Sequence, residues 1–310
     1  MHVIRESSRR LEPRSEISRD DRFGWCVSSA GGDLTALDDE LRDLARFRLP
    51  NDSLGTPAVS PDLRVAAISA ESRVVVVGPE GLTTWEVPHP SWGRGDSERG
   101  SCWFSDDGRI VWAHVPTEDG PDEWLLIDAE SGAISGRASL SCYSAGSSVI
   151  RHPDGIHVGM SVGEGQDGSE TYFGRVEDDS PIVQRLDDRS RVLVSFSDDG
   201  AHFLTTPHSS GPLEIHSFPD GRVVGSVEPD ATLEVDDEFD LFGGFIGPDL
   251  VLFTSVGRDD VFVSPAHDLG NSQVVPMPIA RAGTFLWVVS GRFLVSDWLT
   301  GETTVWRLNV

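Results

Sequence analysis

The stretch Phe104-Ser-Asp-Asp-Gly108 recurs as Phe196-Ser-Asp-Asp-Gly200, and this repetition decides the fold. Related turns are Val59-Ser-Pro-Asp-Leu63, Arg151-His-Pro-Asp-Gly155, Ile246-Gly-Pro-Asp-Leu250 and the degenerate Val289-Ser-Gly-Arg292. The aspartates Asp62, Asp107, Asp154, Asp199 and Asp249 are therefore 45, 47, 45 and 50 positions apart. A nearly constant spacing of this size indicates a repeat protein in which each repeat is one supersecondary unit.

The chemistry of one copy predicts a tight turn between two buried strands. Asp-Gly favours a chain reversal, because Gly accepts a positive φ that other residues resist. The flanking runs 101–104 and 110–113 are rich in β-branched and aromatic residues. A third strand, a second turn and a fourth strand follow at 123–128, 129–132 and 133–140, and again at 213–218, 219–221 and 222–228. Four strands per repeat, without helices between them, predict the blade of a β-propeller.

The number of blades depends on the two ends of the chain. Five full units run from Leu54 to Pro278, and Arg281 to Val310 supplies about three further strands. Residues 22–50 supply three more, at 23–28, 34–38 and 44–49, although residues 37–47 also carry apolar positions at helical spacing. We expect an all-β fold, a single β-propeller of four-stranded antiparallel blades over residues 1–310, with seven blades and six or eight as alternatives. Within the N-terminal segment 1–21, the run 2–5 is expected to close the ring beside the C-terminal strands.

The repeat resembles that of WD40-like β-propeller proteins, as a divergent member of bacterial type. Residues 291–297 and 303–308 look like the second and third strands of a WD repeat, and Trp85 and Trp306 stand nearest to the family's tryptophan. The chain departs from the family by lacking Gly-His before the first strand and Trp-Asp at the end of the third. The resemblance implies a protein-interaction scaffold, and TolB-like or lactonase-like propellers are the alternative families.

The charge of the chain limits its partners. It has 25 basic residues, all of them Arg, against 51 acidic residues, which gives a net charge of −26. Phosphate contacts need clustered cations, so we expect no nucleic acid and no anionic membrane as partner. The acidic excess, including the run 228–240, favours either solubility or a basic protein partner. With no membrane-spanning apolar run and no secretory signal, the expected location is the cytoplasm.

Several motifs that suggest chemistry are better explained by chance or by structure. Residues 159–163 read G-x-S-x-G and residues 163–168 read G-x-G-x-x-G, but neither precedes a predicted helix. Cys26, Cys102 and Cys142 lack C-x-x-C spacing, which indicates buried thiols. His152 and His157 flank a hairpin turn, which favours polar contacts of the hairpin over metal ligation. We therefore expect no metal, no cofactor and no identifiable catalytic residue.

A binding surface is expected on the loops that join one blade to the next and on those between second and third strands. Tryptophan, tyrosine and arginine are the residue types most frequent at interface hot spots. The candidate binding residues of these types are Trp92, Arg94, Tyr143, Arg189, Arg191, Arg281 and Trp298. The expected function is a non-catalytic protein-interaction scaffold. The alternative is a small-molecule binder or an enzyme (hydrolase, lyase or isomerase) with its site at the mouth of the central channel.

Overall fold

The structure is a computed structural model of the 310-residue chain. It describes residues 1–29, 31–53, 55–92, 100–143, 146–165, 168–186, 190–234, 237–257, 260–276, 284–289 and 291–309. Its contacts divide the chain into two compact units. We call Glu16–Leu186 the four-blade unit, and Met1–Ser15 with Asp187–Val310 the three-blade unit.

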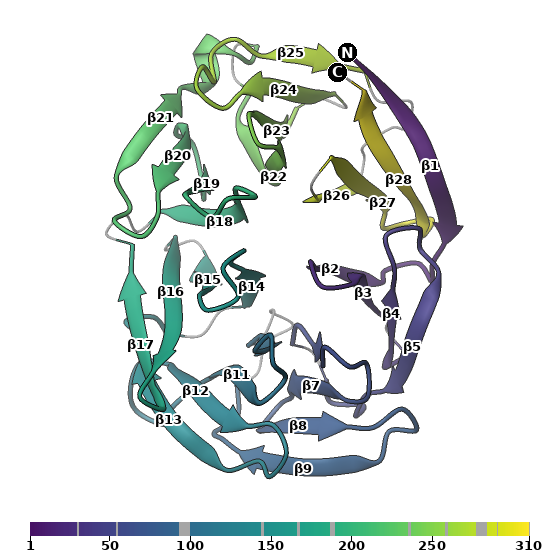
Figure 1. Cartoon of the computed structure of the whole chain (residues 1–310), viewed down its shortest axis with the longest axis vertical. Coiled ribbons are helices and arrows are strands. Elements are labelled where there is room, and N and C mark those ends of the chain that lie inside the picture. Colours follow the sequence, from purple (N-terminus) through teal and green to yellow (C-terminus); the bar gives the residue numbers. More distant parts are fainter. Residues whose placement is uncertain are drawn as a thin grey trace. The chain divides into compact units, whose positions relative to one another are not determined.

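The four-blade unit consists of four antiparallel sheets of four strands each, and every sheet follows chain order (Figure 1). The first two sheets are β2 (Glu16–Asp20), β3 (Gly24–Ser28), β4 (Asp33–Leu37), β5 (Asp43–Arg48) and β6 (Ala58–Val59), β7 (Ala66–Ser69), β8 (Arg73–Val77), β9 (Thr83–Pro88). The other two are β10 (Cys102–Phe104), β11 (Ile110–Val115), β12 (Glu123–Asp128), β13 (Ile134–Ser139) and β14 (Ser147–Arg151), β15 (Val158–Gly163), β16 (Ser169–Glu177), β17 (Ser180–Arg185).

The three-blade unit has three sheets of the same kind. They are β18 (Arg191–Phe196), β19 (His202–Pro207), β20 (Leu213–Ser217), β21 (Val223–Val227), then β22 (Phe239–Gly247), β23 (Leu250–Ser255), β24 (Val261–Pro265), β25 (Gln273–Val275), and finally β26 (Thr284–Val289), β27 (Arg292–Asp297), β28 (Glu302–Asn309) with β1 (His2–Arg10). A short 3-10 helix, η2 (Pro229–Ala231), follows β21. The fold is therefore an all-β, seven-bladed propeller of four-stranded antiparallel sheets, as the repeat predicted.

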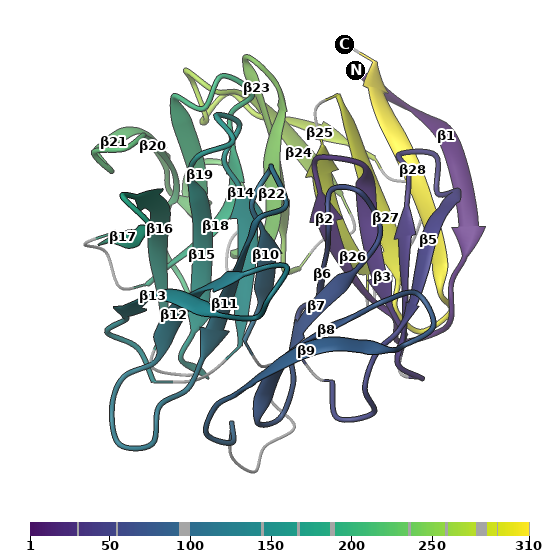
Figure 2. The same cartoon turned by 60° about the horizontal axis from the view of Figure 1, so that its bottom comes forward.

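Both ends of the chain belong to one sheet. Strand β1 pairs antiparallel with β28, from His2 opposite Asn309 to Arg10 opposite Glu302, and it forms the outer strand of this blade (Figure 2). Leu11 then donates its N–H to the carbonyl of Gly301, over 2.8 Å. The N-terminal strand thus completes a sheet whose other three strands come from the C-terminus.

The repeated turns join the first and second strands of their blades. In three of them a serine hydroxyl donates to the aspartate at 2.7 Å, namely Ser60 to Asp62, Ser105 to Asp107 and Ser197 to Asp199. The Ser197 hydrogen bond and the backbone N–H of Ala201 hold the pKa of Asp199 below its usual value. The Asp-Gly turns have the positive φ at glycine that the sequence predicted, 71° at Gly108 and 69° at Gly200.

One alternative for the N-terminal region is wrong. Residues 37–47, where apolar spacing also allowed a short helix, contain the end of β4, a turn and most of β5. Leu41 has a φ of 66°, and Asp38 Oδ1 accepts the N–H groups of Glu40 and Arg42. An Asp that binds the backbone in this way favours a turn over a helix.

Apolar side chains fill the space between neighbouring blades. One cluster joins the β6–β9 and β10–β13 blades, where Trp85 Nε1 also donates to the carbonyl of Ala129 at 2.9 Å. Another joins the β10–β13 and β14–β17 blades around Trp112 and Trp124. Trp306 lies on the third strand of its blade, as the WD repeat resemblance implied, and its buried Nε1 has no hydrogen-bond partner within the described residues. No helix in the described part of the chain is long and apolar enough to cross a membrane.

Candidate functional site

A buried chain of hydrogen bonds joins the β10–β13 blade to the β14–β17 blade. His114, near the end of β11, is fully buried, and its Nε2 lies 2.9 Å from Asp122 Oδ2. Its Nδ1 lies 2.9 Å from the hydroxyl of Ser147, the first residue of β14. Ser147 Oγ in turn accepts the N–H of Ser101 at 2.8 Å and lies 2.7 Å from the Ser101 hydroxyl. Because a carboxylate accepts, His114 Nε2 is the donor in its bond with Asp122.

Ser147, His114 and Asp122 are the residue types of a Ser-His-Asp catalytic triad, but the hydrogen bonds of the serine do not suit a nucleophile. Ser147 Oγ takes part in three hydrogen bonds, with His114 Nδ1, the Ser101 N–H and the Ser101 hydroxyl, and with a single proton of its own it accepts in two of them. Both lone pairs of the hydroxyl are therefore occupied, and none is left to attack a substrate. The chain of bonds instead fixes the start of β14 against the end of β11.

Trp92 covers this network from the β6–β9 side. Its ring packs edge-on against His114, with centroids 5.2 Å apart, and its Nε1 donates to Ser69 Oγ at 3.3 Å. The Ser69 hydroxyl donates to the carbonyl of His114 at 3.1 Å. Gly100 leaves the space for the indole, because a Cβ there would lie 2.5 Å from Trp92 Cζ2. Trp92, which the sequence placed among the exposed residues, is partly buried.

Cys142 lies beside the His114 network. A donor atom of His114, of Asp122 and of Cys142 all lie within 4.8 Å of one another, and histidine, aspartate and cysteine are zinc ligands. However, burial, together with the charge of Asp122, raises the pKa of the Cys142 thiol to about 12. Both nitrogens of His114 are already hydrogen-bonded within the network, to Asp122 and to Ser147. We assign these three residues a structural role.

The network continues into the loop that carries Tyr143. Asp122 donates its N–H to the carbonyl of Cys142 at 2.9 Å, and its own carbonyl accepts the N–H of Leu140 at 2.8 Å. Tyr143, the next residue, is 67% exposed, and its N–H donates to Glu164 Oε1 at 3.3 Å. We call residues 140–143 the Tyr143 loop. Its exposed aromatic ring projects from a backbone that is held at both ends.

Arg185 lies against the same loop. Its guanidinium donates to Ser141 Oγ at 3.0 Å and pairs with buried Glu170 at 3.4 Å, while its side chain stays 30% exposed. Ser141 also donates its N–H to Tyr172 Oη at 3.1 Å. Burial and the hydrogen bond with Glu170 raise the pKa of Tyr172. The Tyr143 loop thus combines an exposed tyrosine with a partly exposed arginine.

The sequence interpretation missed Arg185. Arg185 is directly opposite Tyr172 across β16 and β17, and Glu170 is two residues before Tyr172, on the same face of the strand. The alternation of Glu170 and Tyr172 at the start of a predicted strand was the available signal. The register that brings Arg185 to them is set by the hairpin at 178–179 and is not evident from residue types.

The remaining candidate binding residues have different positions. Arg191 is buried in β18 rather than exposed in a loop, because its guanidinium bonds Thr205 Oγ1, the carbonyl of Pro212 and Glu214 within its own blade. Trp298 is 41% exposed in the β27–β28 turn, and its carbonyl accepts the N–H of Arg14 at 2.8 Å. Arg94, Arg189 and Arg281 lie outside the described residues.

A small cavity lies among the first strands of the four-blade unit. Its lining includes Ser18, Asp20, Thr56, Cys102, Trp103 and Val149. Arg22 pairs with Asp20, donates to the carbonyls of Val59 and Phe104, and stacks 4.6 Å from the ring of Trp103. Burial raises the pKa of Cys102. The Arg22–Asp20 ion pair that borders this cavity therefore connects three blades, and the Cys102 thiol beside it is buried.

Comparison with solved structures supports the fold. The beta-propeller domain of Myceliophteria thermophila Cps50 (Swd1) aligns with a TM-score of 0.64 at 10% identity, over 99% of this chain and 100% of that one. The WD40 domain of Neurospora crassa Pan2 aligns with a TM-score of 0.63 at 10% identity, over 99% and 96%. The chain has the seven-bladed propeller fold of WD40 domains.

A third similar structure is BBS1N, solved in complex with ARL6DN. It aligns with a TM-score of 0.56 at 13% identity, over 99% of this chain and 98% of that one. At these identities the likeness shows the fold alone. A scan against protein-family models finds no match, and a search of curated proteins finds none either.

Proposed function

We propose that this propeller is a non-catalytic scaffold that binds another protein through its exposed loops. The observation that carries the proposal is the Tyr143 loop, where a 67% exposed tyrosine is mounted on a buried hydrogen-bonded network. A rigid aromatic anchor loses little conformational entropy on binding, so it is suited to an interface hot spot. Arg185 contacts the same loop, and arginine is another residue type that is frequent at interface hot spots.

The three-blade unit offers a second anchor. Trp298 and Leu299 are exposed in a turn whose backbone is fixed, because Asp297 Oδ1 accepts the N–H groups of Leu299 and Thr300. These hydrogen bonds keep the pKa of Asp297 below its usual value although burial acts in the opposite direction. Both units therefore present an aromatic side chain on an ordered loop.

The proposed partner is a protein with a basic surface. The chain carries a net charge of −26, which attracts cations over a Debye length and repels nucleic acid and anionic membranes. A similar propeller, BBS1N, was solved in complex with a protein, ARL6DN, which supports a protein partner by analogy of fold. The three free, buried cysteines suit a reducing compartment, and we propose the cytoplasm.

The test is capture of the partner by the wild-type chain and by two matched variants, followed by native mass spectrometry. Tyr143→Ala removes the exposed ring, and Ile182→Ala removes a 39% exposed side chain on β17, the outer strand of the β14–β17 blade that follows the Tyr143 loop. We expect a stoichiometric protein companion with the wild type and with Ile182→Ala, and its loss with Tyr143→Ala. Equal capture by all three would exclude the Tyr143 loop as the binding surface.

A further inference from the structure

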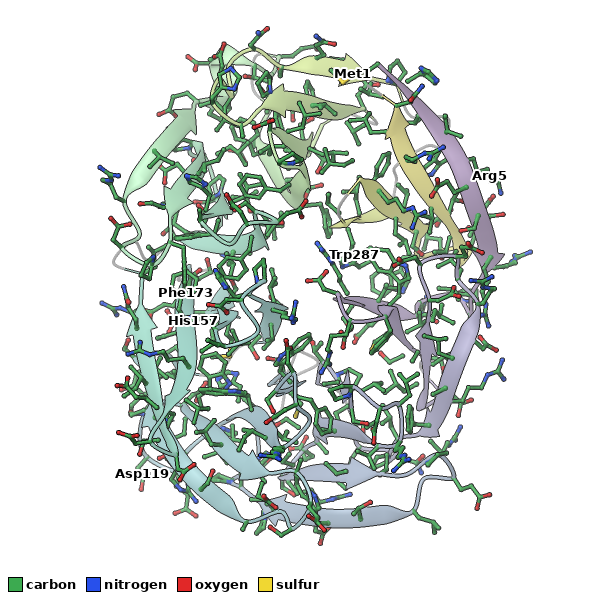
Figure 3. The ribbon with its side chains drawn as sticks, in the orientation of Figure 1. Met1, Arg5, Asp119, His157, Phe173 and Trp287 are labelled. Carbon is green, nitrogen blue, oxygen red and sulfur yellow. The ribbon has the colours of Figure 1, made fainter. Side chains whose placement is uncertain are left out.

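The hairpin between β14 and β15 differs from three of its equivalents at the residue two positions before the turn aspartate. At the position of Ser60, Ser105 and Ser197 it carries His152, and it carries a second histidine five residues later. Both imidazoles face the aspartate of the turn: His152 Nδ1 lies 2.9 Å from Asp154 Oδ1, and His157 Nδ1 lies 2.6 Å from Asp154 Oδ2. The two rings are 5.6 Å apart, and Figure 3 marks His157 on this blade.

We propose that His152, Asp154 and His157 form a binding site for a divalent transition-metal ion such as Zn²⁺. One donor atom of each of the three lies within 4.8 Å of the others. Zinc takes nitrogen and oxygen ligands at about 2.0–2.2 Å, which puts neighbouring ligand atoms about 3.3 Å apart. The observed separations of 2.9 and 2.6 Å, each from one histidine to a different oxygen of Asp154, would open by about 0.4 and 0.7 Å when the ion enters.

The ligands are already oriented by the backbone of the hairpin. Asp154 Oδ1 accepts the N–H groups of Ile156 at 2.8 Å and of His157 at 2.9 Å. Burial opposes ionisation, but these bonds and the side-chain hydrogen bond with His157 keep the pKa of Asp154 well below its usual range. His152 Nδ1 accepts the N–H of Asp154 at 3.2 Å, so its lone pair already faces the turn. Hydrogen bonds that orient a ligand in this way strengthen metal sites.

Access and rigidity also suit a metal site. The side chain of His152 is buried, whereas those of His157 and Asp154 are 23% and 33% exposed, so an ion can enter from solvent and keep water as its remaining ligand. Arg151 pairs with Asp106 of the neighbouring blade at 2.7 Å, which anchors one arm of the hairpin. When the ion binds, it replaces the proton that His157 Nδ1 donates to Asp154.

The β18–β19 hairpin is an internal control for this site. It has Asp199 and His202 at the equivalent positions, with Ser197 in place of the first histidine. There Ser197 Oγ donates to Asp199 and accepts the N–H of His202 at 3.0 Å. Because serine fills this position in three hairpins, His152→Ser is expected to keep the turn folded and to remove only a ligand.

The experiment is titration of the purified, chelator-treated chain with Co²⁺, followed by visible absorption, and with Zn²⁺, followed by calorimetry. We expect one saturable site in the wild type and in His202→Ala. In His152→Ser and in His157→Ala the affinity is expected to fall at least about tenfold, and the Co²⁺ bands to disappear. Absence of saturable binding in the wild type, or equal affinity in the wild type and His152→Ser, would overturn the proposal.

Discussion

Two buried polar networks stabilise corresponding parts of two blades in different ways. In the β18–β21 blade the network is ionic and stays within the blade, where Arg191 bonds Thr205 and Glu214, and His216 lies 2.9 Å from Thr205 Oγ1. In the β10–β13 blade the network contains one carboxylate, Asp122, and it crosses to the next blade through Ser147.

The difference shows that similar repeats can be stabilised separately or coupled to one another, depending on where their polar networks run. A network confined to one sheet stabilises that blade, and its loss is felt there. A network that spans two sheets couples them, and it also holds the Tyr143 loop, since Asp122 bonds the backbone of Leu140 and Cys142. The loop that we assign to binding is thus supported by the network that crosses between blades.

The largest effect on stability is expected from Arg191→Ala. The Arg191 and Glu214 side chains are 4% and 14% exposed, so the substitution leaves a carboxylate with little solvent and without its cation. We expect the free energy of unfolding to fall by about 3–5 kcal/mol, measured by urea denaturation. Arg307→Ala, in a 54% exposed pair with Glu6, is the control and should cost less than about 1 kcal/mol. Equal effects of the two substitutions would contradict the assignment.

His114→Ala should lower the free energy of unfolding by about 2–4 kcal/mol, because it leaves Asp122 and Ser147 buried without their partner. Hydrogen exchange distinguishes it from Arg191→Ala. We expect faster exchange in both the β10–β13 and β14–β17 blades for His114→Ala, and in the β18–β21 blade alone for Arg191→Ala. Exchange confined to the β10–β13 blade in the His114 variant would show that the network does not couple the two blades.

Glu214→Gln should show that the β18–β21 network is ionic, through the pH dependence of the free energy of unfolding. Burial acts against the carboxylate, but the hydrogen bond with His216 and the charge of Arg191 keep the pKa of Glu214 below its usual value. Its stabilisation is therefore complete above the pKa of the unfolded state and is lost as the pH falls through the folded pKa. We expect the variant to be about 2 kcal/mol less stable at pH 7, with a difference that shrinks below about pH 4. A difference independent of pH would argue against an ionised Glu214.

Ser147→Ala should have the smallest effect on stability, about 1 kcal/mol, because it removes neutral hydrogen bonds at the point where the chain crosses between blades. The measurement is again urea denaturation, with Ser131→Ala as a control in an exposed turn. A loss as large as that of His114→Ala would mean that the crossing contact, rather than the buried carboxylate, dominates the network.

The fold was predictable because its signals are local. In three of the turns the aspartate accepts a hydrogen bond from a serine two residues before it, as in Ser105–Asp107, so the pattern repeats where the local structure does. The alternative of a short helix at residues 37–47 was wrong because the spacing of apolar residues carries no information about the turn that Asp38 makes with its own backbone. The ends of strands are hardest to predict from hydrophobic periodicity where a single side chain, hydrogen-bonded to the nearby backbone, sets them.

The candidate site was less predictable because its contacts are not local. Ser147 meets His114 over 33 positions, and Arg185 meets Ser141 over 44. Residue type alone suggested exposure for Trp92 and Arg191, yet both find partners in the interior. Among the candidate residues that the structure describes, only Tyr143 and Trp298 are well exposed.

The most direct test of the binding account is the affinity of the captured partner for the wild type, Tyr143→Ala and Ile182→Ala, measured by biolayer interferometry with unfolding curves of the same samples. The account predicts unchanged stability in both variants and an affinity loss of at least about 30-fold for Tyr143→Ala alone, the effect of a hot spot. Undiminished affinity of Tyr143→Ala would contradict the account.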